Sequence, residues 1–284
     1  MGTIVEVVSP RKEAAQIVFT EISRIDKLLS VYNPDSEISL LNNKGKLSVS
    51  QDTMYIIRKS KELYKATGGA FDITVEPLVR VWGFEKHRYI LPEEREITKV
   101  LRLVGSDKII LNESDNVIKF KTSGMKISLG AIAKGYAVDL AVAKLKETGI
   151  KDCLINAGGD IYCLGNNFGR PWKVAIRDPR KPGIYEVLEL EDKAVATSGD
   201  YEQYFIKGSK RYAHIFDPRT GYPVDEGVCS VTVIASDCLT ADALATSIFV
   251  LGKNGLNGIK KNFKGYIDSR IIECKDNVQD NKKR

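Results

Sequence analysis

The sequence has few of the residues that usually hold a transition metal or a disulfide framework. Its 284 residues include two histidines and five cysteines, with no HExxH motif, no paired histidines and no CxxC spacing. A zinc site is therefore disfavoured, and the odd cysteine count argues against a disulfide framework. We expect each cysteine to behave as a small buried apolar residue; the five are Cys153, Cys163, Cys229, Cys238 and Cys274.

Long apolar runs and the common nucleotide-binding fingerprints are also missing. No stretch of about 18 apolar residues predicts a membrane-spanning helix, and the start MGTIVEV lacks the regions of a secretory signal. As given, the chain is expected to be cytoplasmic, unless an export segment has been removed. Neither GxxxxGK[ST] nor GxGxxG after a strand occurs, so a bound nucleotide would need another architecture.

The charge balance is modest and evenly spread. The net charge of +6 comes from 43 Lys and Arg against 37 Asp and Glu, and 43% of the residues are hydrophobic. These values are typical of a soluble globular protein. No basic stripe with interleaved aromatics occurs, so we expect no nucleic-acid partner. A weakly positive protein would still favour a phosphorylated ligand.

Mixed helices and short β-rich runs predict an α+β protein with antiparallel sheet, because hairpin-like links join many of the strands. Residues 1–274 are expected to form one domain, and 275–284 a disordered tail. The helix at 52–67 is expected to be capped by Asp52, and YNPDSEISLLN (32–42) is expected to be a loop. Further predicted helices cover 11–31, a segment after ISLGAIAKG that Gly149 ends, and 239–251; predicted strands cover 3–8, 152–156, 160–164, 172–177, 185–190, 193–197, 211–216 and 229–235, with hairpins at 107–121 and 263–274.

Glycine gathers in five stretches, and in each it lies near an Asp, a Lys or a small polar residue. Glycine lets the backbone turn sharply and approach a ligand closely, and exposed N–H groups at such turns attract phosphate. Five such stretches in one chain favour a phosphate-bearing ligand. They are TGGAFD (67–72), LGAIAKG (129–135), NAGGD (156–160), TSGD (197–200) and DPRTG (217–221).

Asp242 and Thr246 stand four residues apart on one face of an otherwise apolar predicted helix. Burying an unpaired carboxylate is costly, so two interpretations remain open. In one, Asp242 caps the helix and Thr246 bonds back to the backbone. In the other, both are oxygen ligands of a hard cation. His214 lies before a predicted turn and is either a structural residue or a general base near the glycine-rich turns.

Eight motifs occur in an order that resembles one known family. Together they are similar to the FAD:protein FMN transferases, the ApbE-type flavin transferases once labelled thiamine-biosynthesis lipoproteins. The resemblance extends from Met1 to about Gly252. The motifs are MGT, LLSVYNPDSEISLLN, GGAFDITVEPLV, LGAIAKGYAVD, INAGGD, AVATSGDYEQYF, YAHIFDPRTGYPV and SVTVIASDCLTADALATSIFVLG.

The resemblance implies a T-fold-like architecture with two intertwined subdomains, and an enzyme that uses Mg²⁺ and takes FAD as its substrate. Such an enzyme moves FMN to a Ser or Thr hydroxyl of an acceptor flavoprotein, a redox-pump type subunit, and releases AMP. It also implies association with the outer face of a cytoplasmic membrane through a leader that this sequence does not show. Two alternatives stay open: an FAD pyrophosphatase giving FMN and AMP, and a non-catalytic flavin-binding protein.

The resemblance also implies roles for individual residues. The metal ligands would be Asp242, Thr246, the Ala131 carbonyl and the Ala245 carbonyl. Apart from the resemblance, the ordinary pKa of imidazole suits His214 as general base, and Asp217, three residues on, is a candidate to orient its ring. The family usually has Asp where this chain has Ser128, and we expect this loss of charge to change FAD affinity or the balance between hydrolysis and transfer. The residues implied to contact FAD are Met1, Tyr32, Ala70, Phe71, Asp72, Ser128, Lys134, His214 and Ile215.

Overall fold

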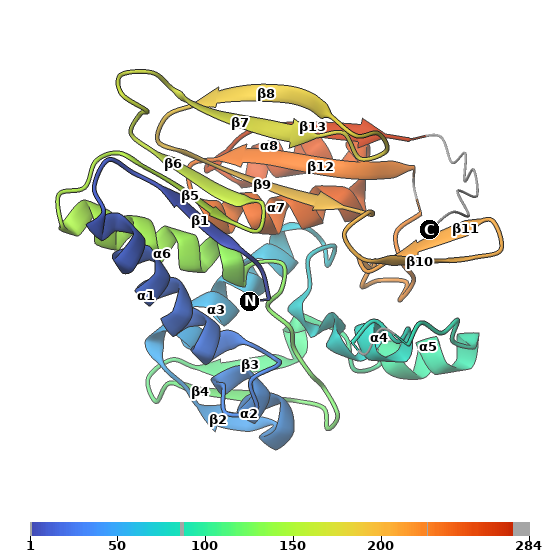
Figure 1. Cartoon of the computed structure of the whole chain (residues 1–284). Coiled ribbons are helices and arrows are strands. Elements are labelled where there is room, and N and C mark those ends of the chain that lie inside the picture. Colours follow the sequence, from blue (N-terminus) through green and yellow to red (C-terminus); the bar gives the residue numbers. More distant parts are fainter. Residues whose placement is uncertain (1, 86–87, 226, 275–284) are drawn as a thin grey trace.

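A six-stranded antiparallel sheet forms the centre of the computed structural model, which describes residues 2–85, 88–225 and 227–274 (Figure 1). Every neighbouring strand pair in this sheet is antiparallel, which confirms the predicted α+β class. The strand order is β1-β5-β6-β9-β12-β13. The strands are β1 (Val5–Val8), β5 (Cys153–Ala157), β6 (Asp160–Leu164), β9 (Lys193–Gly199), β12 (Val228–Ala235) and β13 (Tyr266–Glu273).

Helices cover one face of this sheet and a β-hairpin covers part of the other (Figure 1). The helices are α1 (Glu13–Leu29), α6 (Ala133–Glu147) and α7 (Cys238–Leu251). The hairpin consists of β7 (Trp172–Arg177) and β8 (Ile184–Leu190), and its apolar side chains pack with Val195 and Ile234 of the sheet. Because both faces are covered, all eight residues of β12 are buried.

The amphipathic stripe predicted for the first helix is confirmed. Val18, Ile22, Ile25 and Leu29 follow one another at helical spacing, and all four are buried in the main hydrophobic cluster. The cluster also contains side chains of α6 and α7. Burial of this stripe, chiefly against α6, therefore fixes α1 in place.

A second lobe, inserted between β1 and β5, contains the three-stranded antiparallel sheet β2-β4-β3. Its elements are α2 (Glu37–Lys44), β2 (Lys46–Ser48), α3 (Gln51–Ala66), β3 (Ile109–Asn112) and β4 (Val117–Phe120). The chain leaves the main sheet after β1 and returns at β5, where Val5 lies opposite Ala157. The two lobes are therefore intertwined, as predicted, and one hydrophobic cluster runs through both.

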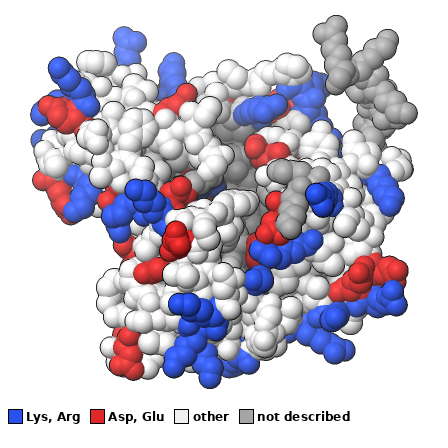
Figure 2. All heavy atoms as spheres, turned by 60° about the horizontal axis from the view of Figure 1, so that its bottom comes forward, with Lys and Arg blue, Asp and Glu red and all other residues white. Residues whose placement is uncertain are grey.

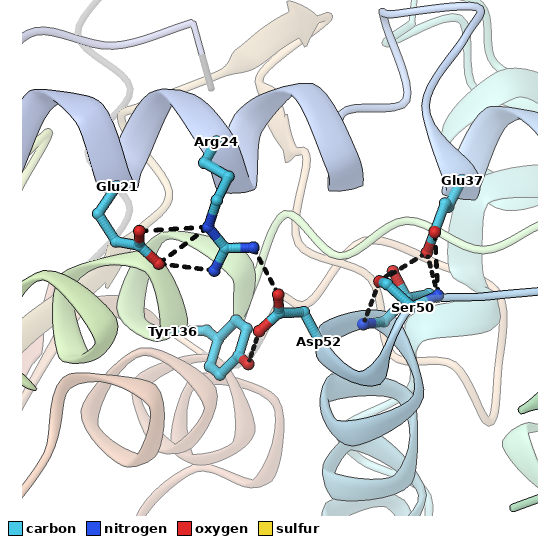
Figure 3. A network of polar contacts seen from close by, with 7 residues as sticks. Glu21, Arg24, Glu37, Ser50, Asp52 and Tyr136 are labelled. Carbon is cyan, nitrogen blue, oxygen red and sulfur yellow. Dashed lines mark hydrogen bonds and ion pairs between the residues drawn. The ribbon is translucent and has the colours of Figure 1, made fainter.

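A polar network joins α1, α3 and α6 across this boundary (Figure 3). Arg24 contacts Glu21 and Asp52, each at 2.6 Å, and the Tyr136 hydroxyl donates to Asp52 at 2.6 Å. The prediction that Asp52 caps α3 is wrong. Ser50 is the cap, because its side chain accepts the Thr53 N–H and leaves Asp52 free to contact the other helices.

A smaller region carries an aromatic cluster and lies beside the second lobe. It combines η1 (Ile73–Val75), α4 (Glu76–Val81) and α5 (Glu94–Leu101) with the hairpin of β10 (Tyr204–Lys207) and β11 (Lys210–Ala213). Phe84 packs against Phe205 and Phe216, and Trp82 packs against Tyr212. This packing links the segment after α3 to a hairpin more than a hundred residues later in the chain.

Three expectations about local structure are wrong. The expected loop at 32–42 contains α2, whose N-terminus is capped by Ser36. The expected hairpin at 263–274 is one strand, β13, which follows α8 (Leu256–Asn262) and pairs with β12. The expectation that all five cysteines are unpaired apolar residues is wrong for two of them. Cys229 and Cys274 form a disulfide, because the pairing of β12 with β13 brings these distant positions together. Cys153, Cys163 and Cys238 are free and buried, as expected.

Two further expectations concern the chain as a whole. The predicted tail at 275–284 lies outside the described residues. Within the described part, every helix is too short or too polar to cross a membrane.

Candidate functional site

A cavity of about 620 Å³ collects the unusual residues of the sequence. Its walls come from β9 and α7 of the main layer, the segment after α3, the start of α6 and the chain after β11. All five glycine-rich stretches contribute to the lining. Basic and acidic side chains are interspersed over the face shown in Figure 2, so charge is not gathered on one side there.

Asp242 lies in the cavity wall, in the second turn of α7. The helix begins at Cys238, and Asp237 caps it by accepting the Thr240 N–H. Asp139 of α6 accepts the N–H groups of Cys238 and Leu239 at 2.7 and 2.8 Å. The cap interpretation of Asp242 is therefore wrong, because other carboxylates already satisfy the first turn.

The first turn of α6 holds the Asp242 carboxylate through backbone. The Gly135 N–H donates to Asp242 Oδ2 at 3.2 Å. A Cβ at position 135 would lie only 2.3 Å from the Cys238 carbonyl oxygen, so only glycine lets α6 and α7 approach this closely. Gly135 therefore both spaces the two helices and supplies a donor to the site.

Three charged groups meet beside this contact. The Lys134 Nζ lies 2.8 Å from Asp160 Oδ2 and 3.7 Å from Asp242 Oδ2. Asp242 is 5% exposed and Asp160 3% exposed. Burial and the charge of Asp160 raise the pKa of Asp242, although Lys134 opposes the change. Burial alone would lower the pKa of Lys134, but the charges of Asp242 and Asp160 outweigh it and raise this pKa.

Two carboxylates and one ammonium leave this group with one net negative charge when all three are ionised. Asp160 is placed there by a two-residue turn between β5 and β6, in which Gly158 and Gly159 have φ of +64° and +98°. A tight hairpin turn with two positive φ values favours glycine at both positions. The stretch NAGGD thus aims an acidic residue at the cavity.

Thr246 lies one turn after Asp242 and also lines the cavity. Its hydroxyl hydrogen-bonds with Ser198 Oγ of β9 at 3.0 Å. The cap interpretation expected Thr246 to bond back to the backbone instead. Ala131 lines the cavity at the turn before α6. Ala245 is fully buried and does not belong to the lining.

This set of oxygen donors fits a hard divalent cation. Carboxylate, hydroxyl and backbone carbonyl are the ligand types that Mg²⁺ accepts, and water and substrate phosphate usually complete its shell. Within the described residues, no three His, Cys, Asp or Glu side chains gather in a way that could hold a metal. A cation here would therefore depend on Asp242, on neutral oxygens and on its substrate, and the surplus negative charge beside Lys134 would attract it.

His214 lines the same cavity immediately after β11. Its Nδ1 lies 3.1 Å from the Gln203 carbonyl oxygen. Since a carbonyl can only accept, Nδ1 carries the proton and Nε2 keeps its lone pair. Burial lowers the pKa of His214, the Gln203 carbonyl opposes the change, and the charge of Lys134 adds to it. The imidazole is therefore a neutral base at neutral pH.

The suggested role of Asp217 in orienting His214 is wrong. The Asp217 carboxylate accepts from the backbone N–H and the guanidinium of Arg219 at 2.8 to 2.9 Å. The ring of His214 is held instead by the Gln203 carbonyl. A backbone carbonyl in a loop leaves no residue-type signal in a sequence.

The remaining predicted residues lie around the cavity with different degrees of exposure. Tyr32 is 76% exposed at its rim, whereas Ala70, Phe71 and Ile215 are buried in its wall. Ser128 also lines it. Met1 lies outside the described residues. The structure thus gathers all the other predicted site residues except Ala245 around one cavity.

Asp72 has a structural part in this wall. Its carboxylate accepts the Thr74 N–H and hydroxyl at 2.8 and 2.7 Å, and the Ser106 N–H and hydroxyl at 3.2 and 2.6 Å. Burial raises the pKa of Asp72, and these four donors oppose the change. The residue therefore fixes the segment 70–75 against η2 (Ser106–Lys108).

Two polar residues of the site, Asp160 and Ser198, were not predicted from the sequence as site residues. Asp160 contacts Lys134, and Ser198 contacts Thr246. Each ends or lies within a glycine-rich stretch that the sequence had singled out, NAGGD and TSGD. Glycine clustering was thus the available signal, but it could not say which neighbouring side chain faces the cavity.

Comparison with known families gives one match over nearly the whole chain. The model described as the ApbE family matches residues 1–267. The FAD:protein FMN transferase of Vibrio cholerae is 36% identical over 246 residues, which cover 82% of this chain and 73% of that protein. The FAD:protein FMN transferase of Haemophilus influenzae is 35% identical over 242 residues, 81% of this chain and 70% of the relative.

Solved structures resemble this fold equally broadly. The crystal structure of the ApbE protein from Thermotoga maritima has a TM-score of 0.87 at 34% identity, covering 96% of this chain and 91% of that one. The apo form of Pseudomonas stutzeri flavinyl transferase ApbE has a TM-score of 0.84 at 28% identity, covering 96% and 92%.

Proposed function

Because this chain belongs to the ApbE family and is a transferase, we propose that it moves the FMN moiety of FAD to a Ser or Thr hydroxyl of an acceptor protein. In this proposal AMP leaves, Mg²⁺ is required, and the acceptor is a flavoprotein subunit of the redox-pump type. If the acceptor is membrane-bound, the enzyme works at the membrane surface.

One observation carries the proposal. The cavity is lined by a buried cluster of Asp160, Asp242 and Lys134, which has one net negative charge when all three are ionised. The neutral imidazole of His214 lines the same cavity. Cleaving a diphosphate by an alcohol requires neutralisation of phosphate charge at one place and removal of a proton at another. Asp242 with Thr246 suits the first task, and His214 suits the second.

Each of these residues has a defined part in the proposed reaction. The acceptor hydroxyl oxygen attacks the FMN-side phosphorus, the bond from that phosphorus to the bridging oxygen breaks, and AMP takes the electron pair. His214 Nε2 receives the hydroxyl proton, because the Gln203 carbonyl keeps the other ring nitrogen protonated. Lys134 offers an ammonium to the diphosphate. When bound at Asp242 and Thr246, Mg²⁺ would supply further neutralisation of the phosphate charge.

Exclusion of water decides between transfer and hydrolysis. Phe71 and Ile215 are buried in the cavity wall, and Asp72 holds the neighbouring segment in place through four hydrogen bonds. Phe71 and Ile215 offer no side-chain hydrogen bond to a water molecule beside the diphosphate. An alcohol that is held at His214 therefore competes well with water for the phosphorus.

The test is mass spectrometry of a candidate acceptor protein after incubation with this enzyme, FAD and Mg²⁺. The expected result is one FMN phosphodiester on a Ser or Thr, with an equal amount of AMP, and neither product when EDTA replaces Mg²⁺. AMP without an adduct would favour the FAD pyrophosphatase. Bound FAD without AMP would favour a non-catalytic flavin-binding protein.

A further inference from the structure

We propose that Asp160 is a positioning residue that keeps the Lys134 ammonium off Asp242, so that Asp242 can accept a divalent cation while Lys134 stays available to phosphate. The inference rests on the proposed function, because it takes Asp242 as the cation ligand. It adds a task for a residue to which the proposed function gives no role.

The distances indicate which carboxylate holds the ammonium. Lys134 Nζ forms its shorter ion pair with Asp160 Oδ2, at 2.8 Å, and a longer one with Asp242 Oδ2, at 3.7 Å. A third contact, at 3.4 Å, joins Nζ to the Gly130 carbonyl. The ammonium is thus held more closely by Asp160 than by Asp242.

Asp160 is anchored where it cannot follow a moving partner. It is the first residue of β6, pairs with Ala157 across the two-glycine turn, and lies in the interior of the six-stranded sheet. Its side chain is almost fully buried. Lys134 has a flexible four-carbon stem, so its position depends on which carboxylate attracts it more.

Asp242 faces Gly135 and Lys134 through one oxygen, Oδ2. Its carboxyl also interacts with the Asp160 side chain. A move of about 1 Å by the ammonium would shorten its ion pair with Asp242 to hydrogen-bond range. That pair would neutralise the carboxylate that a cation needs, and it would place two positive charges in one small space.

The first test uses the metal-free protein. A crystal structure of Asp160→Asn without added metal should show Lys134 Nζ within about 3 Å of an Asp242 oxygen. This result does not depend on whether a cation binds. An unmoved Nζ in a folded variant would overturn the inference, even if the proposed function is correct.

The second test is a double-mutant cycle that measures Mn²⁺ binding by electron paramagnetic resonance. If Asp160 acts through Lys134, Asp160→Asn weakens Mn²⁺ binding by about tenfold when Lys134 is present, but by less than about threefold in the Lys134→Gln background. Equal weakening in both backgrounds would mean that Asp160 acts only through its charge, and would overturn the inference.

Glu76→Gln is a matched control for the loss of one negative charge. Glu76 is a buried carboxylate that lines the same cavity but pairs with Arg80 at 2.9 Å. Its effect on Mn²⁺ affinity should be the same with and without Lys134. If even the wild-type protein fails to bind Mn²⁺, the metal part of the proposed function is wrong, and the position of Nζ in Asp160→Asn still decides the present inference.

Discussion

His214 has the protonation state that a general base needs, because of two local contacts. The Gln203 carbonyl fixes the proton on Nδ1, and burial lowers the pKa of the ring below its ordinary value. The base is therefore active above this lowered pKa and loses activity as the pH falls through it. Neither effect requires a carboxylate partner.

The pH dependence of transfer tests this role. The wild-type rate should fall on the acid side, below about pH 6.5, because the imidazole then gains a proton. His214→Gln should lower kcat by about 10²–10⁴-fold and should lose this acid limb. Stopped assays of FMN adduct between pH 5 and 8 provide the measurement. A variant that keeps both the rate and the limb would leave His214 with a structural role.

Asp242 should be essential for the reaction but unfavourable for stability. Asp242→Asn keeps an acceptor for the Gly135 N–H and removes the charge, so Mg²⁺-dependent transfer should fall by about 100-fold or more. Burial raises the pKa of this carboxyl, which means that its charged form is disfavoured in the folded state. The thermal midpoint of the variant at pH 8 should therefore equal or exceed that of the wild type. A variant with wild-type transfer rates would contradict the assignment.

At the scale of elements, the site depends on how closely α6 and α7 approach. Asp139 accepts from the first turn of α7, and Gly135 lies against Cys238 without a side chain. These contacts set the position of Asp242 relative to Lys134. The contact is local to two helices, although their sequences are separated by about a hundred residues.

Gly135→Ala tests the approach directly. The new Cβ would meet the Cys238 carbonyl, so the helices must separate, at a cost of about 1–3 kcal/mol in free energy of unfolding. Urea denaturation measures this cost, and transfer activity should fall with it. Gly258→Ala in α8 is the matched control, because a Cβ there meets nothing within 4 Å; it should be neutral or stabilising. Equal effects of the two substitutions would sink the close-approach argument.

At the scale of the molecule, the polar network of Figure 3 ties the second lobe to the helical layer. Tyr136 of α6 donates to Asp52 of α3, and Arg24 of α1 approaches the same carboxylate. Opposite charges and a donor at a half-buried carboxylate lower the pKa of Asp52, although burial, the largest influence, opposes the change. Arg24, Asp52 and Tyr136 do not line the cavity, although Tyr136 follows Gly135 in α6.

Tyr136→Phe should therefore change stability without changing chemistry. Loss of this hydrogen bond to a charged acceptor should lower the free energy of unfolding by about 1.5–3 kcal/mol, with kcat unchanged. The control is Tyr55→Phe, because Tyr55 stacks on Tyr136 at 5.4 Å and is partly exposed. Denaturant titration and transfer assays separate the two effects. A fall in kcat with unchanged stability would show that the network serves the reaction instead.

The sequence predicted elements well where their signal was local. The stripe from Val18 to Leu29 has helical period, and the strands at 160–164 and 172–177 have β-rich composition, so neighbours along the chain were enough. It failed where partners were distant. The segment 263–274 contains turn-like residues, but its strand pairs with β12, and Cys274 reaches Cys229 through that pairing.

By itself, the sequence determined the residue types and the family: glycine-rich turns beside acidic and basic residues, and an acidic group with a hydroxyl one turn apart on an apolar helix. Only the tertiary structure decided which of these meet. Asp160 of β6, Lys134 of α6 and Asp242 of α7 converge because sheet pairing and close helix packing join segments far apart in the chain. Such contacts depend on long-range burial and exact spacing, which leave no periodic trace in the amino-acid order.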